Sequence, residues 1–151
     1  MKKNSFEKVK RLVVKIGSSL LIEKNKFNKE WLESLIQDLL FLRKKKIDVI
    51  IVASGSVSLG KKQLGINSKK VKIFEKQAYA ACGQVVMMNN FMKIFKKKKI
   101  NVAQILLTYS DTEDRRKSLN CRETINELMK MNILPIINEN DSVAIDELKF
   151  G

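Results

Sequence analysis

Short, mostly apolar runs alternate with longer stretches of helical periodicity along this 151-residue chain. Because the runs are too short for helices and mostly lack polar alternation, we expect them to be strands buried on both faces. They occupy residues 11–16, 48–53, 102–107 and 133–137. The other stretches predict helices over residues 28–42, 57–64, 72–98 and 118–131. We expect the third helix to consist of two pieces that meet near Gly83. This alternation predicts an α/β fold, with a parallel sheet in a three-layer αβα sandwich.

Composition narrows the class of protein. Hydrophobic residues make up 44% and charged residues 30%, a balance typical of a globular domain in water. The apolar runs fall well short of the roughly 20 residues of a membrane helix. The basic N-terminus lacks the apolar stretch and cleavage site of a secretory signal, so we expect a cytoplasmic protein with no membrane partner. With no histidine, and with Cys82 and Cys121 far apart in the sequence, we expect no metal site formed by protein residues.

The net charge of +14 suggests a basic nucleic-acid-binding module as an alternative. Lysine outnumbers arginine 25 to 5, however, whereas side chains that read base edges are commonly arginine. The lysine runs at residues 44–46 and 96–99 each close a predicted helix, where cations suit the helix dipole. We therefore expect solvated helix ends and no nucleic-acid partner.

Small or polar residues follow each predicted strand. They are Gly17-Ser18-Ser19, Ser54-Gly55-Ser56, Thr108 and Asn138-Glu139-Asn140-Asp141. In an open parallel sheet the loops after the carboxyl ends of the strands gather at one edge, where ligands bind. The first loops leave backbone amides open to an anion, and the last adds amides and a carboxylate. One edge of the sheet therefore offers both anion-binding donors and an acceptor for an ammonium group.

Lys15 lies within the first apolar strand, just before a Gly-Ser-Ser turn. A buried lysine needs a partner because an unpaired buried charge is costly, and a phosphate oxygen beside such a turn is a suitable one. A lysine that reaches water from an edge strand explains the same pattern. The spacing alone leaves both interpretations open.

Ser54-Gly55-Ser56 precedes a predicted helix, whose N-terminus attracts a carboxylate or phosphate, and the glycine allows close approach to the backbone. A capped strand-to-helix turn needs the same residue types. Residues 55–61 also fit the first seven positions of a P-loop, but Lys62 stands where a P-loop needs Ser or Thr to hold Mg²⁺. A P-loop NTPase is therefore the weaker alternative.

Five segments, taken together and in order, resemble the glutamate 5-kinases of the amino acid kinase family. They are residues 13–19, residues 54–57 with Leu64-Gly65, residues 76–84, residues 103–108 and residues 132–141. The resemblance covers residues 11–151 as the N-terminal, glutamate-binding part of an amino acid kinase domain, and residues 1–10 form a basic extension before it. It implies that the chain holds the N-terminal part of the family's sheet.

The resemblance also implies a reaction. ATP would phosphorylate the side-chain carboxylate of L-glutamate, giving glutamyl 5-phosphate in the first step of proline synthesis, with Mg²⁺ as the second cofactor. Lys15 matches the family lysine that contacts the ATP phosphates and helps neutralise the transferring phosphoryl group, with Gly17 and Ser18 beside it. The resemblance further implies a homo-oligomer for the full-length enzyme, and proline as a feedback inhibitor.

Four residues match the glutamate site of the family. Ser54 matches the serine that contacts the substrate, and Gly55 beside it allows close backbone approach. Asp141 matches the carboxylate that binds the substrate, at its ammonium group, and Asn138 matches a further glutamate contact. Asp111 and Glu147 fall in the stretch that surrounds this site and influences inhibition by proline.

The sequence departs from the family in two respects. The family pattern continues beyond Gly151 with an Asp-Asn-Asp segment and a nucleotide-binding part, so we expect a fragment that is inactive alone. A shortened, non-catalytic protein that binds glutamate or proline is the alternative. The second departure is Ser56-Val57-Ser58, where small apolar residues are commoner, and we expect this change to be tolerated.

Overall fold

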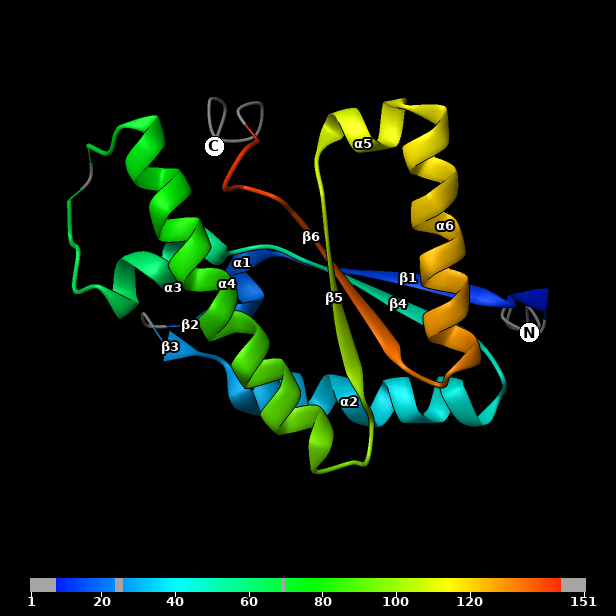
Figure 1. The fold of residues 1–151 in the computed structure, drawn as a ribbon. Helices are drawn as coiled ribbons and strands as arrows, with labels where there is room; N and C mark the ends of the chain where they lie inside the picture. Colours follow the sequence, from blue (N-terminus) through cyan, green and yellow to red (C-terminus); the bar gives the residue numbers. More distant parts are fainter. Residues whose placement is uncertain (1–7, 24–25, 69, 145–151) are drawn as a thin grey trace, which may run out of the picture.

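The computed structural model describes residues 8–23, 26–68 and 70–144, and Figure 1 shows them as a twisted sheet flanked by helices. Four parallel strands lie in the order β1-β4-β6-β5. They are β1 (Arg11–Ile16), β4 (Asp48–Ala53), β5 (Val102–Leu107) and β6 (Leu134–Glu139). The first three agree with the predicted bounds. The last continues past the predicted end because Asn138 and Glu139 still pair with Leu106 and Leu107 of β5.

The helices connect these strands. They are α1 (Ser18–Leu21), α2 (Lys29–Lys44), α3 (Ser56–Gln63), α4 (Ile73–Lys96), α5 (Tyr109–Glu113) and α6 (Arg115–Lys130). A small antiparallel hairpin, β2 (Ile22–Glu23) with β3 (Lys26–Phe27), precedes α2. The sequence did not predict α1, α5 or the hairpin, since elements of two to five residues are too short to show a periodic pattern.

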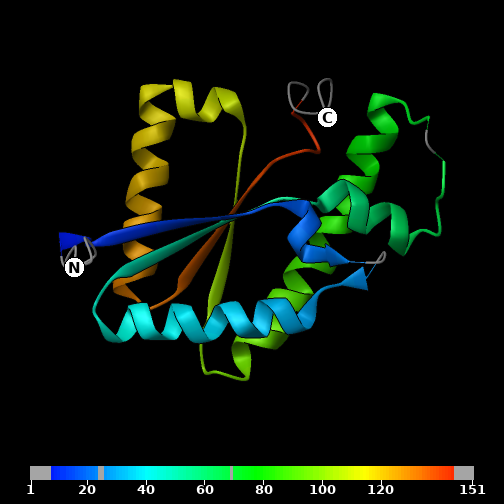
Figure 2. The same ribbon diagram turned by 180° about the vertical axis from the view of Figure 1, so that it is seen from behind.

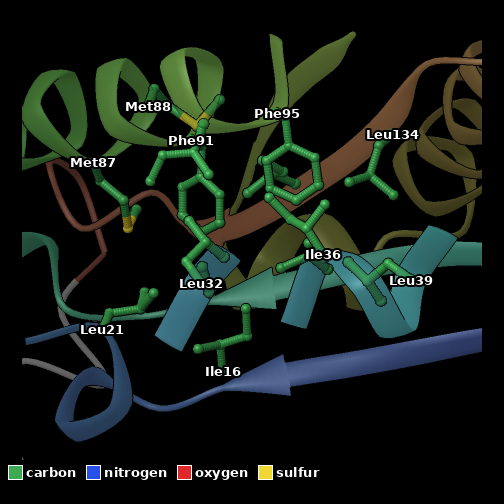
Figure 3. Close-up of a cluster of buried hydrophobic side chains, with 14 of the residues drawn as sticks. Ile16, Leu21, Leu32, Ile36, Leu39, Met87, Met88, Phe91, Phe95 and Leu134 are labelled. Carbon is green, nitrogen blue, oxygen red and sulfur yellow. The ribbon is translucent and has the colours of Figure 1, made fainter. Parts of the chain in front are cut away.

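Helices α2 and α4 cover one face of the sheet and enclose the hydrophobic core (Figures 1 and 2). Alternate side chains of a strand point to the same face, and those facing α2 and α4 are apolar. The sheet contributes Ile16, Val49, Ile51, Leu134 and Ile136 to this core. The helices contribute Leu32, Ile36, Leu39, Met87, Phe91 and Phe95, most of them fully buried (Figure 3). This packing fixes the position of the strands and therefore of the loops that follow them.

Helix α6 lies against the opposite face of the sheet, away from α2 and α4 (Figures 1 and 2). Ile50 and Leu107 of the sheet face Cys121 and Ile125 of α6 across a small hollow. The predicted three-layer αβα arrangement is therefore confirmed. Coverage of this face is incomplete, since Val13 of β1 is 56% exposed.

Helix α4 is one continuous helix, so the predicted break near Gly83 is wrong. Gly83 serves instead for close packing against α3. A Cβ atom at Gly83 would lie 1.7 Å from the backbone oxygen of Ser56, and one at Gly60 would lie 1.7 Å from that of Tyr79. The absence of side chains at these two positions allows the backbones of α3 and α4 to touch.

The basic runs lie where the sequence predicted them, at helix C-termini. Arg43 and Lys44 occupy the last turn of α2, and Lys93 and Lys96 that of α4. At the other end of α2, Asn28 caps the helix, because its side chain accepts a hydrogen bond from the Trp31 amide at 3.1 Å. Within the described residues, no helix is both long enough and apolar enough to cross a membrane.

Candidate functional site

The loops after β1 and β4 are joined at the carboxyl edge of the sheet. Ser54 follows β4, and both its amide and its hydroxyl donate to the Ile16 carbonyl at the end of β1, at 3.2 and 3.3 Å. Gly55 comes next with φ 111°, and a Cβ there would lie 3.1 Å from the Ser18 Cβ. The structure therefore brings Gly17-Ser18 and Ser54-Gly55 together at the edge where the sequence predicted that the strand-end loops gather, because β1 and β4 are neighbours in the sheet.

The turn between β4 and α3 is too tight to be a P-loop. The helix begins at Ser56, directly after Gly55, so residues 56–61 are helical and cannot cradle a phosphate with a loop. Gly60 lies inside α3 against the backbone of α4, and the Lys61 Nζ donates to the Ser68 carbonyl at 2.6 Å. The P-loop alternative is therefore wrong, because the two glycines serve a turn and a helix contact.

Lys15 lies on β1, an edge strand of the described sheet, and its side chain is exposed. The interpretation as a buried lysine in need of a partner is therefore wrong, and the edge-strand interpretation accounts for its position. Lys15, Ser54, Thr108 and Asn138 line a hollow of about 360 Å³ at the carboxyl edge of the sheet. A phosphate-bearing ligand in this hollow would lie beside the Lys15 ammonium group, which can form a charge-assisted hydrogen bond with a phosphate oxygen.

Asn138 is a buried amide with an unsatisfied donor. It lies near the end of β6, opposite Leu106 of β5, and only 5% of it is exposed. Its Nδ2 atom is buried and has no hydrogen-bond partner among the described residues. Leaving such a donor unpaired costs about 1–3 kcal/mol, so a ligand oxygen that accepts from it would bind favourably.

Asp141 is buried beside α3, with 7% of its surface exposed. Its carboxylate accepts a hydrogen bond from the hydroxyl of Ser56, the first residue of α3. The turn that carries Asp141 is held on both sides. The Asn140 amide donates to the Leu107 carbonyl at 2.8 Å, and the Gln77 side chain of α4 donates to the Ala144 carbonyl at 3.3 Å.

Ser56 is the functional candidate that sequence reasoning passed over. The sequence placed it in the Ser54-Gly55-Ser56 turn and treated it as a tolerated departure from the family pattern, without a role of its own, yet it is 2% exposed and joined to Asp141. Its place in the same strand-end segment as Ser54 and Gly55 was the available signal. Asp141 does not line the hollow that contains Lys15, so the predicted residues form two neighbouring groups at one edge.

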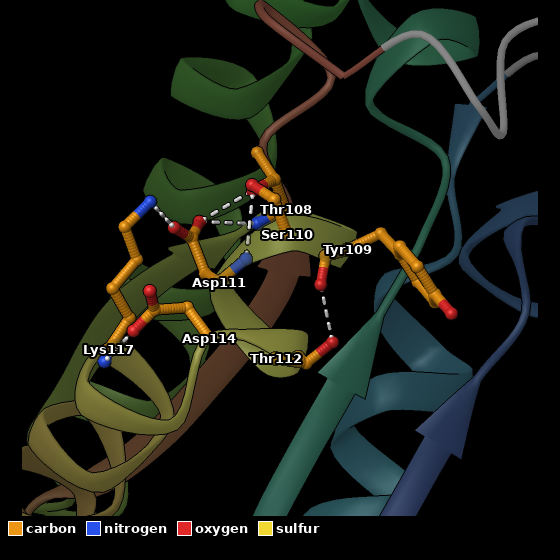
Figure 4. A network of polar contacts seen from close by, with 7 residues as sticks. All are labelled: Thr108, Tyr109, Ser110, Asp111, Thr112, Asp114 and Lys117. Carbon is orange, nitrogen blue, oxygen red and sulfur yellow. Dashed lines mark hydrogen bonds and ion pairs between the residues drawn. The ribbon is translucent and has the colours of Figure 1, made fainter.

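The loop after β5 forms a third polar group (Figure 4). The Thr108 amide and hydroxyl both donate to the Asp111 carboxylate, at 2.8 and 2.7 Å, and Lys117 of α6 forms an ion pair with it at 2.9 Å. The hydrogen bonds from Thr108 and then the bond from Lys117 lower the pKa of Asp111 to about 2. This network fixes the start of α5 next to the hollow. Glu147, the other residue expected near this region, lies outside the described residues.

The described residues contain no group of three or more His, Cys, Asp or Glu side chains that could hold a metal ion. Cys82 and Cys121 are free thiols, and burial raises the pKa of the Cys121 thiol. Mg²⁺ usually binds through one or two carboxylates together with substrate phosphates. These residues therefore do not form a complete Mg²⁺ site.

Comparison with known proteins places this architecture in a family. The amino acid kinase family matches residues 10–151 of the chain. The chain is 48% identical to the glutamate 5-kinase of Pelagibacter ubique over 143 residues, which is 94% of this chain and 39% of the relative. It is 45% identical to the enzymes of the same name from Agrobacterium fabrum, over 142 residues, and Brucella ovis, over 143 residues.

Those two matches cover 93% and 94% of this chain but only 36% and 38% of the relatives. The chain thus spans between about a third and two fifths of the length of the curated relatives that it matches. The family match nevertheless extends over nearly the whole chain, and the parallel sheet with its strand-end loops agrees with it. The chain belongs to the amino acid kinase family.

Proposed function

We propose that this chain forms the glutamate-binding part of a glutamate 5-kinase, which transfers the γ-phosphoryl group of ATP to the side-chain carboxylate of L-glutamate. The observation that carries the proposal is a pair of unlike buried groups near the end of β6. Asp141 offers a carboxylate, and Asn138 offers an amide donor that lacks a partner among the described residues. An α-amino acid carries the complementary pair, an ammonium group and a carboxylate.

Each residue then has a role that its chemistry allows. Asp141 binds the substrate ammonium group, and the Asn138 amide donates to a substrate carboxylate oxygen. Gly55 lets the substrate approach the backbone closely. Ser54 contacts the substrate after its hydroxyl turns away from the Ile16 carbonyl, to which it donates at 3.3 Å.

The reaction itself needs charge neutralisation more than proton transfer. A glutamate side chain with a pKa of about 4.3 is already ionised at neutral pH, so no general base has to activate it. One carboxylate oxygen attacks the γ-phosphorus, a new P–O bond forms, and the bond to the β-phosphate oxygen breaks to release ADP. Lys15, with Gly17 and Ser18 nearby, neutralises the negative charge on the transferring phosphoryl group.

Mg²⁺ enters this proposal only with ATP, since the described residues do not form a complete site for it. The nucleotide would supply phosphate oxygens to the ion. Inhibition by proline and self-association of the enzyme rest on the resemblance alone, and no described contact supports either.

A chimeric enzyme tests the proposal directly. The matched 143 residues of the Pelagibacter ubique glutamate 5-kinase would be replaced by the corresponding residues of this chain. Glutamyl 5-phosphate formed from ATP and L-glutamate would be trapped with hydroxylamine and measured as the hydroxamate. We expect an active chimera in which Lys15→Ala lowers kcat, by about 100-fold or more, because it removes charge stabilisation from the transition state.

Two controls make the test decisive. Lys62→Ala removes a lysine outside the proposed site and should leave activity unchanged. Calorimetry on the chimera would show whether L-glutamate binds. A folded chimera that binds glutamate without phosphorylating it would favour the non-catalytic binding protein, and a folded chimera that neither binds nor phosphorylates it would refute the proposed function.

A further inference from the structure

The Ser56 hydroxyl donates a hydrogen bond to the Asp141 carboxylate across 85 positions of sequence. The two residues are 2% and 7% exposed. This contact joins the start of α3 to the turn that follows β6. A hydrogen bond from a hydroxyl to an ionised carboxylate is among the stronger side-chain contacts, and burial strengthens it further.

The backbone of Ser56 is held firmly by its surroundings. On one side, Gly55 adopts the left-handed φ of 111° that begins the turn into α3. On the other side, α3 packs so closely against α4 that a Cβ at Gly83 would lie 1.7 Å from the Ser56 carbonyl oxygen. A donor on so constrained a backbone can fix the direction of the carboxylate that it contacts.

Asp141 lies in a turn whose backbone is held in place by neighbouring elements. Its turn is anchored through the Asn140 amide to β5 and through Ala144 to Gln77 of α4. Those contacts involve the backbone of the turn, whereas the Ser56 hydroxyl contacts the carboxylate itself. A carboxylate has about four lone-pair sites, so it can accept from Ser56 and also bind a cationic group.

We propose that Ser56 is a positioning residue that aligns the Asp141 carboxylate toward the ammonium group of the amino-acid substrate. This inference rests on the proposed function, because it takes Asp141 as the ammonium-binding group. It adds a specificity role. The Ser56 hydroxyl strengthens binding of amino acids relative to dicarboxylic acids of the same length that lack the amino group.

The test compares L-glutamate with glutarate, which has both carboxylates and no amino group. Affinities of the 151-residue chain for the two ligands would be measured by calorimetry for wild type, Ser56→Ala and Ser58→Ala. Ser58 lies two residues further along α3, is exposed, and provides the same chemical change away from Asp141. We expect Ser56→Ala to lower the preference for L-glutamate over glutarate about tenfold, and Ser58→Ala to leave it unchanged.

A general loss of structure would lower the affinity for both ligands equally. An unchanged ratio of the L-glutamate and glutarate affinities in Ser56→Ala would therefore overturn the inference. Should Ser56→Ala not fold, Ser56→Cys keeps the side-chain size but donates weakly, and the same fall in the ratio is expected.

A double-mutant cycle in chemical unfolding gives an answer that needs no ligand. If Ser56 holds Asp141, the effects of Ser56→Ala and Asp141→Asn on the unfolding equilibrium constant will not multiply. Strictly multiplicative effects would overturn the inference whatever the ligand data show. Non-multiplicative effects in a folded chain that binds no L-glutamate would instead refute the proposed function and leave the contact itself supported.

Discussion

Asp111, in the loop after β5, is an ionised group held by several neighbouring side-chain and backbone contacts. Two hydrogen bonds from Thr108 and an ion pair with Lys117 surround its carboxylate. These contacts hold its pKa at about 2, below the ordinary value of 3.8. At neutral pH, Asp111 therefore serves as a fixed anionic cap for α5.

This depressed pKa predicts an acid-dependent loss of stability. Because folding lowers the pKa, the stabilisation is fully present above about pH 4 and is lost as the pH falls toward about 2. We expect Asp111→Asn to be less stable than wild type at pH 7 and to lose that difference between pH 4 and pH 2. Thermal unfolding of both proteins at several pH values measures this stability difference.

Glu113→Gln is the matched control, since it removes an exposed acid from the same short helix. The acid-dependent difference predicted for Asp111→Asn is measured against this variant. A stability difference between Asp111→Asn and wild type that stays constant from pH 7 to pH 2 would contradict this account of Asp111.

The sequence predicted individual residues unevenly. The positions of Ser54, Gly55 and Asn138 at one sheet edge followed from the strand ends. The exposure of Lys15 did not, because strand order decides which strand is an edge and the sequence pattern does not contain strand order. The Ser56 contact was missed because it joins residues 85 positions apart. Such pairing depends on tertiary packing rather than local pattern.

At the scale of elements, the contact between α3 and α4 organises the site. Gly60 and Gly83 let the two helix backbones touch, which positions Ser56 at the start of α3. Helix α4 also sends Gln77 to the Ala144 carbonyl in the segment after Asp141. The segments that follow β4 and β6 therefore both contact the same long helix, α4.

Gly83→Ala should disrupt this arrangement. In an open helix position the change would stabilise by about 0.5–1 kcal/mol. Here the added methyl group would lie 1.7 Å from the Ser56 carbonyl oxygen, a separation that forces the helices apart. We expect a loss of about 1–3 kcal/mol in the free energy of unfolding, measured by chemical denaturation.

Val85→Ala controls for substitution in α4, because Val85 is 71% exposed and faces away from the core. It should leave stability within about 0.5 kcal/mol of wild type. If Gly83→Ala proved as stable as wild type or more so, the close helix contact would be wrong.

The sequence predicted elements better than it predicted residues. The strands from Arg11, Asp48 and Val102 have the expected bounds because each is a short apolar run closed by a polar turn. The predicted break in α4 was wrong because a glycine inside a helical pattern has two explanations. Periodicity alone cannot distinguish a weak point in the helix from a site of close packing. The structure shows close packing, because the backbone of α3 lies directly against Gly83.

At the scale of the whole molecule, the net charge of +14 is the feature that could also indicate a nucleic-acid-binding protein. Cations occupy the last turns of α2 and α4, where they interact with the negative ends of the helix dipoles. Several others pair with acids at the surface, as Lys97 does with Glu33 at 2.8 Å. These placements account for basic residues by local structure and require no nucleic-acid partner.

If the basic residues serve local structure, the chain should bind nucleic acid only weakly and in a salt-sensitive way. In a gel-shift assay with random duplex DNA and with single-stranded RNA, we expect any shift at about 20 mM salt to vanish at about 150 mM. A shift that persists at the higher salt, or that prefers one sequence, would favour the nucleic-acid-binding alternative.

The α/β architecture was predictable because alternating elements leave few ways to bury a parallel sheet. The strand order β1-β4-β6-β5 and the glycine contact of α3 with α4 were not, since both depend on packing between distant segments. The position of the proposed ligand-binding edge follows from the architecture, and the chemistry proposed for it follows from the residues that end the strands.

Calorimetric titration of L-glutamate into the chain tests this account most directly. We predict saturable binding at one site per chain, with affinity lowered at least about tenfold by Asp141→Asn and unchanged by Ser58→Ala. A folded chain that shows no saturable binding, or an Asp141→Asn variant that binds as tightly as wild type, would contradict the assignment of this sheet edge as a glutamate site.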